Sequence, residues 1–204
     1  MKYSISIFIV FILLTYIFLY VCDYINKNDN QNINCSIPIK VFLSIVNSIL
    51  ANILFIKYGL SIYSIMYVVA WTILFITSYI DYSTKYIYEI TSKPLLVISS
   101  ILFIFNLVIG VTNLRSILWL IISLLIVIIF GRFNYIGKGD IDIYLALMIS
   151  LTNFKIAIIL LIFSLGISGI ASISLLLVKR VSLNYRKPLC PSIALASYIL
   201  LIIV

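Results

Sequence analysis

Carboxylates are the side chains of this chain best able to carry out acid–base chemistry, because the 204-residue sequence contains no histidine. The lack of histidine excludes Ser-His and Cys-His nucleophile pairs, HExxH zinc proteases and metal sites with histidine ligands. The three cysteines form no CxxC pair, which excludes a cysteine-rich zinc site. The remaining candidates are the six carboxylates Asp23, Asp29, Asp81, Glu89, Asp140 and Asp142.

The first group of candidates lies in the segment ITSYIDYSTKYIYEITSKP. Asp81 ends a long apolar stretch, Glu89 follows in the connecting segment, and Pro94 opens the next apolar stretch. The same pattern also fits a carboxylate at a helix end followed by a solvated loop, because loop carboxylates are usually in water.

The second group lies in GRFNYIGKGDIDIYLALMIS, where Gly137, Lys138 and Gly139 precede Asp140 and Asp142. Glycines allow the backbone to leave helical geometry and allow another segment to approach closely. Both carboxylates can also be read as acids at a helix N-terminus, as a cap and in the first turn. That interpretation suits Asp142 better, because the span lengths place Asp140 at membrane depth, where ionisable residues are expensive and usually functional.

The rest of the chain is apolar and predicts that a membrane domain positions these carboxylates. Hydrophobic residues make up 64% of the chain and charged residues 10%, against about 45–50% and about 25% in soluble domains. This composition excludes a soluble globule and a disordered chain. Seven charge-free stretches can span a bilayer, the shorter ones with flanking Lys or Arg that snorkel. The eighth stretch, 143–154, must recruit upstream residues that include Asp142 and Asp140. The stretches are 3–22, 41–56, 58–80, 94–114, 116–131, 143–154, 156–178 and 188–204.

We therefore expect an all-α fold, a polytopic helical membrane protein with about eight transmembrane helices and one domain over residues 1–204. Basic residues predict its orientation, because Lys and Arg are enriched in cytoplasmic loops. With alternating spans, ten basic residues fall on one side and four on the other. The ten-charge side is expected to be cytoplasmic and to hold all six carboxylates, with both termini outside and 23–39 as a short cytoplasmic loop. The first span lacks a small-residue cleavage site and is expected to be a retained helix.

Asp81 and Asp140 are thus predicted to lie at the same membrane face. When two carboxyl groups lie close together in a partly dry site, repulsion between like charges disfavours ionisation of both. One group therefore keeps its proton, and the pair titrates as a unit. In aspartic proteolysis the ionised carboxylate takes a proton from water, and the protonated one polarises the scissile carbonyl. This chemistry requires no histidine, metal or covalent nucleophile.

Four segments, in order along the chain, resemble the type IV prepilin peptidases, which are GxGD-type membrane aspartyl proteases. IKYGLS at 56–61 is similar to a turn at the end of a span in that family. FITSYIDYSTKYIYEITSKP is similar to the first aspartate motif, in which an aspartate at a span's end precedes Ile-Pro-Asp and Leu-Pro. GKGD at 137–140 matches the second motif, GxGD. KPLCPSIALASYI at 187–199 is similar to the closing Pro-Phe-Gly-Pro-Phe-Leu-Ala segment.

By this resemblance Asp81 and Asp140 are the catalytic pair, supported by the motif residues Gly137, Lys138 and Gly139. The resemblance implies a multi-pass endopeptidase of the bacterial cytoplasmic membrane that serves type IV pilus assembly or protein secretion. Its implied substrates are prepilins or pseudopilins, which carry a short basic leader before an apolar helix and are cut at the cytoplasmic face. Membrane lipid is the other expected partner, no nucleic acid is expected, and no cofactor is implied.

The chain departs from the family pattern at several positions. IYE at 87–89 replaces Ile-Pro-Asp, PLCP at 188–191 replaces Pro-Phe-Gly-Pro, and Asp142 stands where the family commonly has lysine. Residues two apart on a helix differ by about 200°, so we expect Asp142 to face away from the partner of Asp140. Glu89 and Asp142 are therefore candidates for a substrate-binding or secondary role.

The first loop differs as well, because longer family members carry paired CxxC motifs there and also N-methylate the new amino terminus. This loop has Cys35 alone. We therefore expect no zinc, and the resemblance does not extend to methyl transfer.

Two other functions fit parts of the sequence. The missing proline and the Lys-to-Asp change would suit a catalytically degenerate relative that acts as an assembly partner. Four carboxylates at one membrane face would suit a Mg²⁺-dependent transferase acting on a lipid-linked phosphate, although the DDxxD or DxxxD clusters usual in such enzymes are missing from the sequence. Cleavage that survives a chelator would favour the peptidase.

Overall fold

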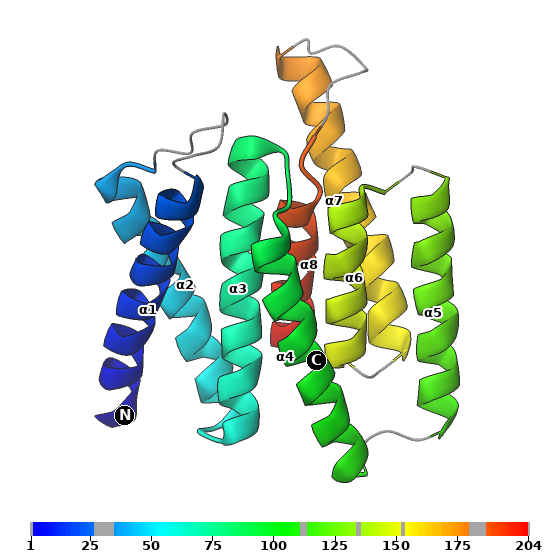
Figure 1. Cartoon of the computed structure of the whole chain (residues 1–204), viewed down its shortest axis with the longest axis horizontal. Helices are drawn as coiled ribbons and strands as arrows, with labels where there is room; N and C mark the ends of the chain where they lie inside the picture. Colours follow the sequence, from blue (N-terminus) through cyan, green and yellow to red (C-terminus); the bar gives the residue numbers. More distant parts are fainter. Residues whose placement is uncertain are drawn as a thin grey trace. The chain divides into compact units, whose positions relative to one another are not determined.

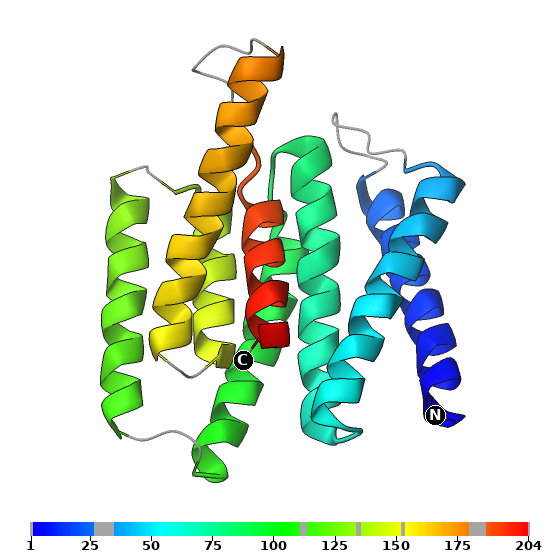
Figure 2. The same ribbon diagram turned by 180° about the vertical axis from the view of Figure 1, so that it is seen from behind.

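The computed structural model describes residues 2–26, 35–110, 114–133, 136–151, 154–179 and 187–203. Within these ranges the regular structure is all α-helical, as predicted, and consists of eight helices (Figures 1 and 2). Five of them, α1 to α4 and α7, are long and apolar enough to cross a membrane, while α5 and α8 contribute shorter apolar stretches. The helices are α1 (Lys2–Asn26), α2 (Ile37–Tyr58), α3 (Ile62–Thr84), α4 (Glu89–Val108), α5 (Leu114–Arg132), α6 (Lys138–Leu151), α7 (Phe154–Lys179) and α8 (Cys190–Ile203).

The predicted loop 23–39 is shorter than expected at both ends. Helix α1 continues to Asn26 and α2 already begins at Ile37, while residues 27–34, including Asp29, lie outside the described part of the chain. Pro38 fits near the start of α2 because its missing N–H would have had no helical partner there. The carboxylate of Asp23 pairs with the ammonium of Lys40 on α2 at 2.6 Å. The negative charge of Asp23, which was expected to end the first helix, is thus neutralised, and α1 continues past it.

Helix α4 begins at Glu89 rather than at Pro94, which lies inside the helix. The carbonyl of Tyr88 accepts the N–H groups of Thr91 at 3.0 Å and Ser92 at 3.2 Å, so the first turn closes upstream of the proline. Helix α6 begins at Lys138, which agrees with the prediction that this short span must recruit Asp140.

Contacts divide the chain into two compact units, residues 1–76 and residues 77–204, and the single-domain assignment over 1–204 stays a prediction. In the first unit α1 packs along α2. The Asn47 side chain donates hydrogen bonds to the hydroxyls of Thr15 at 2.9 Å and Thr72 at 3.1 Å. These bonds join α1, α2 and the first part of α3, in the way that polar side chains commonly connect helices inside a bilayer.

In the second unit α6 is the central helix. It packs against α4, α5, α7 and α8, and Ile143, Tyr144 and Leu147 on it are completely buried. Three connections meet at one end of this unit: the turn from α3 to α4, the approach to α6 and the segment that leads into α8 (Figure 1). The end of α3, the start of α6 and the start of α8 are thereby brought to the same place.

Candidate active site

A pocket of about 340 Å³ lies where α3 ends and α6 and α8 begin. Both Asp81 and Asp140 line it, together with residues 85–87, 137–139 and 187–189. Two carboxylates that are far apart in the sequence therefore share one cavity, and the GKGD motif forms one of its walls.

Asp81 lies in the last turn of α3 and is 4% exposed. Its Oδ2 atom accepts a hydrogen bond of 3.0 Å from the backbone N–H of Cys190, the first residue of α8. A backbone N–H bond to a carboxylate is charge-assisted, and the N-terminus of a helix carries partial positive charge. Both effects stabilise the ionised form of Asp81.

Asp140 lies in the first turn of α6 and is partly buried. Its carboxylate turns back over Gly137, so that a Cβ atom at Gly137 would lie only 2.9 Å from Asp140 Oδ2. The charges of Asp81 and Asp140 both act on the side chain of Cys190, which is completely buried. Both carboxyl groups therefore lie near the same buried thiol.

Gly139 makes the approach of the two aspartate segments possible. A Cβ atom at Gly139 would lie 2.6 Å from Cβ of Ile87 and 3.2 Å from its Cγ2 atom. Ile87 belongs to the turn that follows Asp81, and Gly139 directly precedes Asp140. A side chain at position 139 would push the two segments apart, which gives the second glycine of GKGD a physical role.

The turn after Asp81 is shaped by Lys85, which has a left-handed backbone conformation with φ of 61°. Its N–H group donates to the carbonyl of Asp81 at 2.7 Å, so the end of α3 resembles a helix that terminates on a left-handed residue. This geometry turns Tyr86 and Ile87 into the wall of the pocket.

The third wall consists of residues 187–190, which we call the α8 strap. The Lys187 ammonium donates to the carbonyl of Ser168 at 2.6 Å and lies 3.4 Å from the Ser172 hydroxyl, both on α7. Burial lowers the pKa of Lys187 from its ordinary value. Lys85 and Lys138 line the same pocket, so three lysines share it with the two carboxylates.

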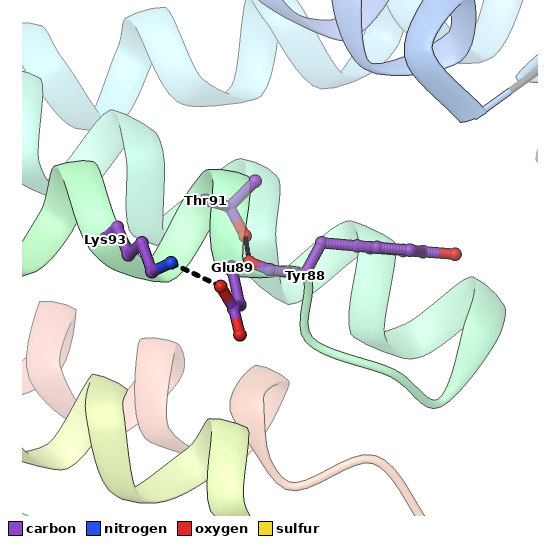
Figure 3. Close-up of polar contacts among 4 residues, drawn as sticks. All are labelled: Tyr88, Glu89, Thr91 and Lys93. Carbon is purple, nitrogen blue, oxygen red and sulfur yellow. Dashed lines mark hydrogen bonds and ion pairs between the residues drawn. The ribbon is translucent and has the colours of Figure 1, made fainter.

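Glu89 and Asp142, predicted as secondary residues, do not line the pocket. Glu89 is exposed and forms an ion pair with Lys93 one turn along α4, and the Thr91 hydroxyl donates to the Tyr88 carbonyl at 2.9 Å (Figure 3). The Asp142 carboxyl group lies near Ser92, Glu89 and Lys93 of α4. Asp142 thus faces α4 and lies outside the pocket that Asp81 and Asp140 line.

Sequence reasoning missed two parts of this site. The backbone N–H of Cys190 and the ammonium of Lys187 both take part, although their segment was interpreted only as a family resemblance. The signal for the first was present, because Pro188 and Pro191 on either side of Cys190 are typical of a helix start. No sequence signal connected Lys187 with α7.

Among the described residues, no group of three or more His, Cys, Asp and Glu side chains is arranged to hold a metal ion. No family model, curated protein or solved structure matches the chain.

Proposed function

We propose that this protein is a membrane aspartyl endopeptidase that removes the short basic leader of type IV prepilin-like or pseudopilin precursors. The observation that carries the proposal is the shared pocket of Asp81 and Asp140. A pair of carboxyl groups in one partly dry cavity is the requirement for activating water against a peptide bond. The order of the two motifs and the GKGD sequence add the resemblance to the prepilin peptidases.

In the proposed mechanism Asp81 is the ionised carboxylate, because it accepts the N–H of Cys190. It takes a proton from a water molecule, whose oxygen attacks the scissile carbonyl carbon. Asp140 holds the other proton and donates a hydrogen bond to the carbonyl oxygen as negative charge develops there. Asp81 then passes the proton that it took from water to the leaving nitrogen, and cleavage of the C–N bond releases the leader and the new amino terminus.

We assign eight spans to the chain, with both termini outside and the pocket at the cytoplasmic face of a bacterial inner membrane. Support comes from the three connections that meet at the pocket end of the second unit (Figure 1) and from the basic residues predicted on that side. The short α6, with 14 residues, would place Asp140 near that face. A precursor held in the membrane by its apolar helix would present its leader junction at this depth.

The decisive experiment is co-expression of the protein with a prepilin from the same genome, followed by a gel-shift assay for leader removal. Cleavage should occur with the wild type and be lost in both Asp81→Asn and Asp140→Asn. Glu89→Gln and Asp142→Asn are the matched controls, since these carboxylates lie outside the pocket, and both should retain cleavage. Activity should survive a chelator.

Two outcomes would overturn the proposal. Strict metal dependence would favour the Mg²⁺-dependent transferase. A wild-type protein that is present in the membrane and cleaves none of several prepilins would favour a catalytically degenerate assembly partner. In that second case Asp142→Lys, which restores the residue common in the family, is the first variant to test for recovered cleavage.

A further inference from the structure

The α8 strap is held at both ends by polar contacts within the second unit. At its start, the Lys187 ammonium donates to the Ser168 carbonyl of α7 at 2.6 Å. At its end, the N–H of Cys190 donates to the Asp81 carboxylate at 3.0 Å. Four residues therefore connect a carbonyl in the middle of α7 to one of the two carboxylates of the pocket.

The strap has little conformational freedom between these contacts. Pro188 has a fixed φ angle, and the carbonyl of Leu189 accepts the N–H groups of Ser192 at 3.0 Å and Ile193 at 3.1 Å. These two bonds close the first turn of α8 and fix the plane of the peptide group that carries the Cys190 N–H. A displacement of Lys187 would therefore be passed on to the bond with Asp81.

The Lys187 contact is a strong one. An ammonium donor gives a charge-assisted hydrogen bond, which is about twice as strong as a neutral one. The Ser168 carbonyl also accepts the Ser172 hydroxyl at 2.7 Å, and Lys187 lies within 3.4 Å of that hydroxyl. The ammonium is thus held by two oxygens of α7.

From this arrangement we propose that Lys187 is a positioning residue for Asp81: by anchoring the strap to α7, it holds the Cys190 N–H on the Asp81 carboxylate. The consequence for catalysis rests on the proposed peptidase function, whereas the anchoring itself does not. Lys187 acts here through the strap and not by contact with the substrate. A lysine that bound the substrate at the pocket wall would instead act by direct contact.

Cys190 provides a readout of the strap that is independent of catalysis. Its side chain is completely buried in the folded protein. In a full-length chain with Cys22→Ala and Cys35→Ala, Cys190 is the single thiol, so the rate of maleimide labelling in membranes reports the opening of the strap. We expect Lys187→Met to raise this rate about tenfold, as for the loss of one charged hydrogen bond, and Lys187→Arg to keep it close to the parent rate.

The matched control is Lys155→Met, which removes an exposed lysine at the other end of α7 and should leave labelling unchanged. Global unfolding is monitored in a chain that retains Cys22, a buried residue of the first unit. If Lys187→Met also exposes Cys22, the milder Lys187→Gln variant replaces it, and the same criterion applies. An unchanged Cys190 labelling rate in the folded variant would overturn the proposal.

Cleavage kinetics separate positioning from substrate binding. A positioning role predicts that Lys187→Met lowers kcat about tenfold with KM within about twofold, and that Lys187→Arg restores most of the activity. A raised KM with unchanged kcat would show that Lys187 contacts the substrate and would overturn the inference. If the wild type cleaves no precursor, the peptidase proposal fails, while the labelling result still decides whether Lys187 anchors the strap.

Discussion

Gly139 packs directly against Ile87: a Cβ atom at Gly139 would lie 2.6 Å from the Cβ atom of Ile87. This single contact joins the turn that follows Asp81 to the start of α6, where Asp140 lies. The separation between the two aspartate segments is therefore set by the absence of a side chain at one position. Two predictions on the glycines of the GKGD motif test this arrangement.

Gly139→Ala should separate the two walls of the pocket. The nearest atom is a Cβ that cannot rotate away, so the backbone must shift, and overpacking of this kind costs about 1–3 kcal/mol of unfolding free energy. We expect leader cleavage to fall at least about tenfold, as for a small displacement of catalytic groups. The matched control is Gly166→Ala on α7, where nothing lies within 4 Å of the added methyl group. Full activity of Gly139→Ala would contradict the role assigned to this contact.

Gly137→Ala should lower the rate of leader cleavage without a comparable loss of free energy of unfolding. Its φ angle is not positive, so alanine fits the backbone, and the free energy of unfolding should change by less than about 1 kcal/mol. The added Cβ would lie 2.9 Å from Oδ2 of Asp140, which forces the carboxylate to rotate. Thermal unfolding of the purified protein and the cleavage rate, measured together, check this separation. A proportional loss of both would mean that Gly137 acts on the fold instead.

Most of the helical architecture could be predicted from the sequence because charged residues are rare and mark the ends of apolar stretches. The errors concerned the residues at which two helices begin or end. Asp23 does not end α1, because Lys40 of α2 pairs with it. Pro94 does not start α4, because the Tyr88 carbonyl closes a turn upstream of it.

The candidate site was predictable in its carboxylates and not in its supporting groups. Asp81 and Asp140 stood out because few ionisable residues exist in the chain and both adjoin apolar stretches. The Cys190 contact uses a backbone N–H, whose one signal in the sequence is the pair Pro188 and Pro191, which is typical of a helix start but does not point to Asp81. The Lys187 contact with α7 depends on how two helices pack, and a single sequence does not specify that packing.

Glu89→Gln should have little effect on either stability or cleavage. The Glu89 side chain is exposed, and its ion pair with Lys93 lies on the surface of α4 (Figure 3). Exposed pairs of this kind contribute little to stability, because water and salt screen the two charges. We expect a cleavage rate within about twofold of the wild type. The co-expression assay measures this directly, and a loss comparable to that of Asp81→Asn would place Glu89 in the catalytic machinery.

The α8 strap should loosen at a lower pH than it would if Lys187 had the ordinary pKa of a lysine. Burial lowers the pKa of Lys187, so the ammonium is lost at a lower pH than in an exposed lysine, and the charge-assisted bond to Ser168 weakens as the pH rises through that value. Arginine stays protonated throughout this range. Maleimide labelling of Cys190 should therefore increase more steeply with pH in the parent chain than in Lys187→Arg.

The same comparison controls for the other titrating groups of the pocket. Asp81, Lys85, Lys138 and Asp140 line it together with Lys187 and are identical in both chains, as is the Cys190 thiol, whose own ionisation raises its reactivity. The ratio of the Cys190 labelling rate in the parent chain to that in Lys187→Arg therefore reports the effect of Lys187 alone. A ratio that stays constant between neutral pH and pH of about 10, close to the ordinary lysine value, would mean that the charge of Lys187 does not hold the strap.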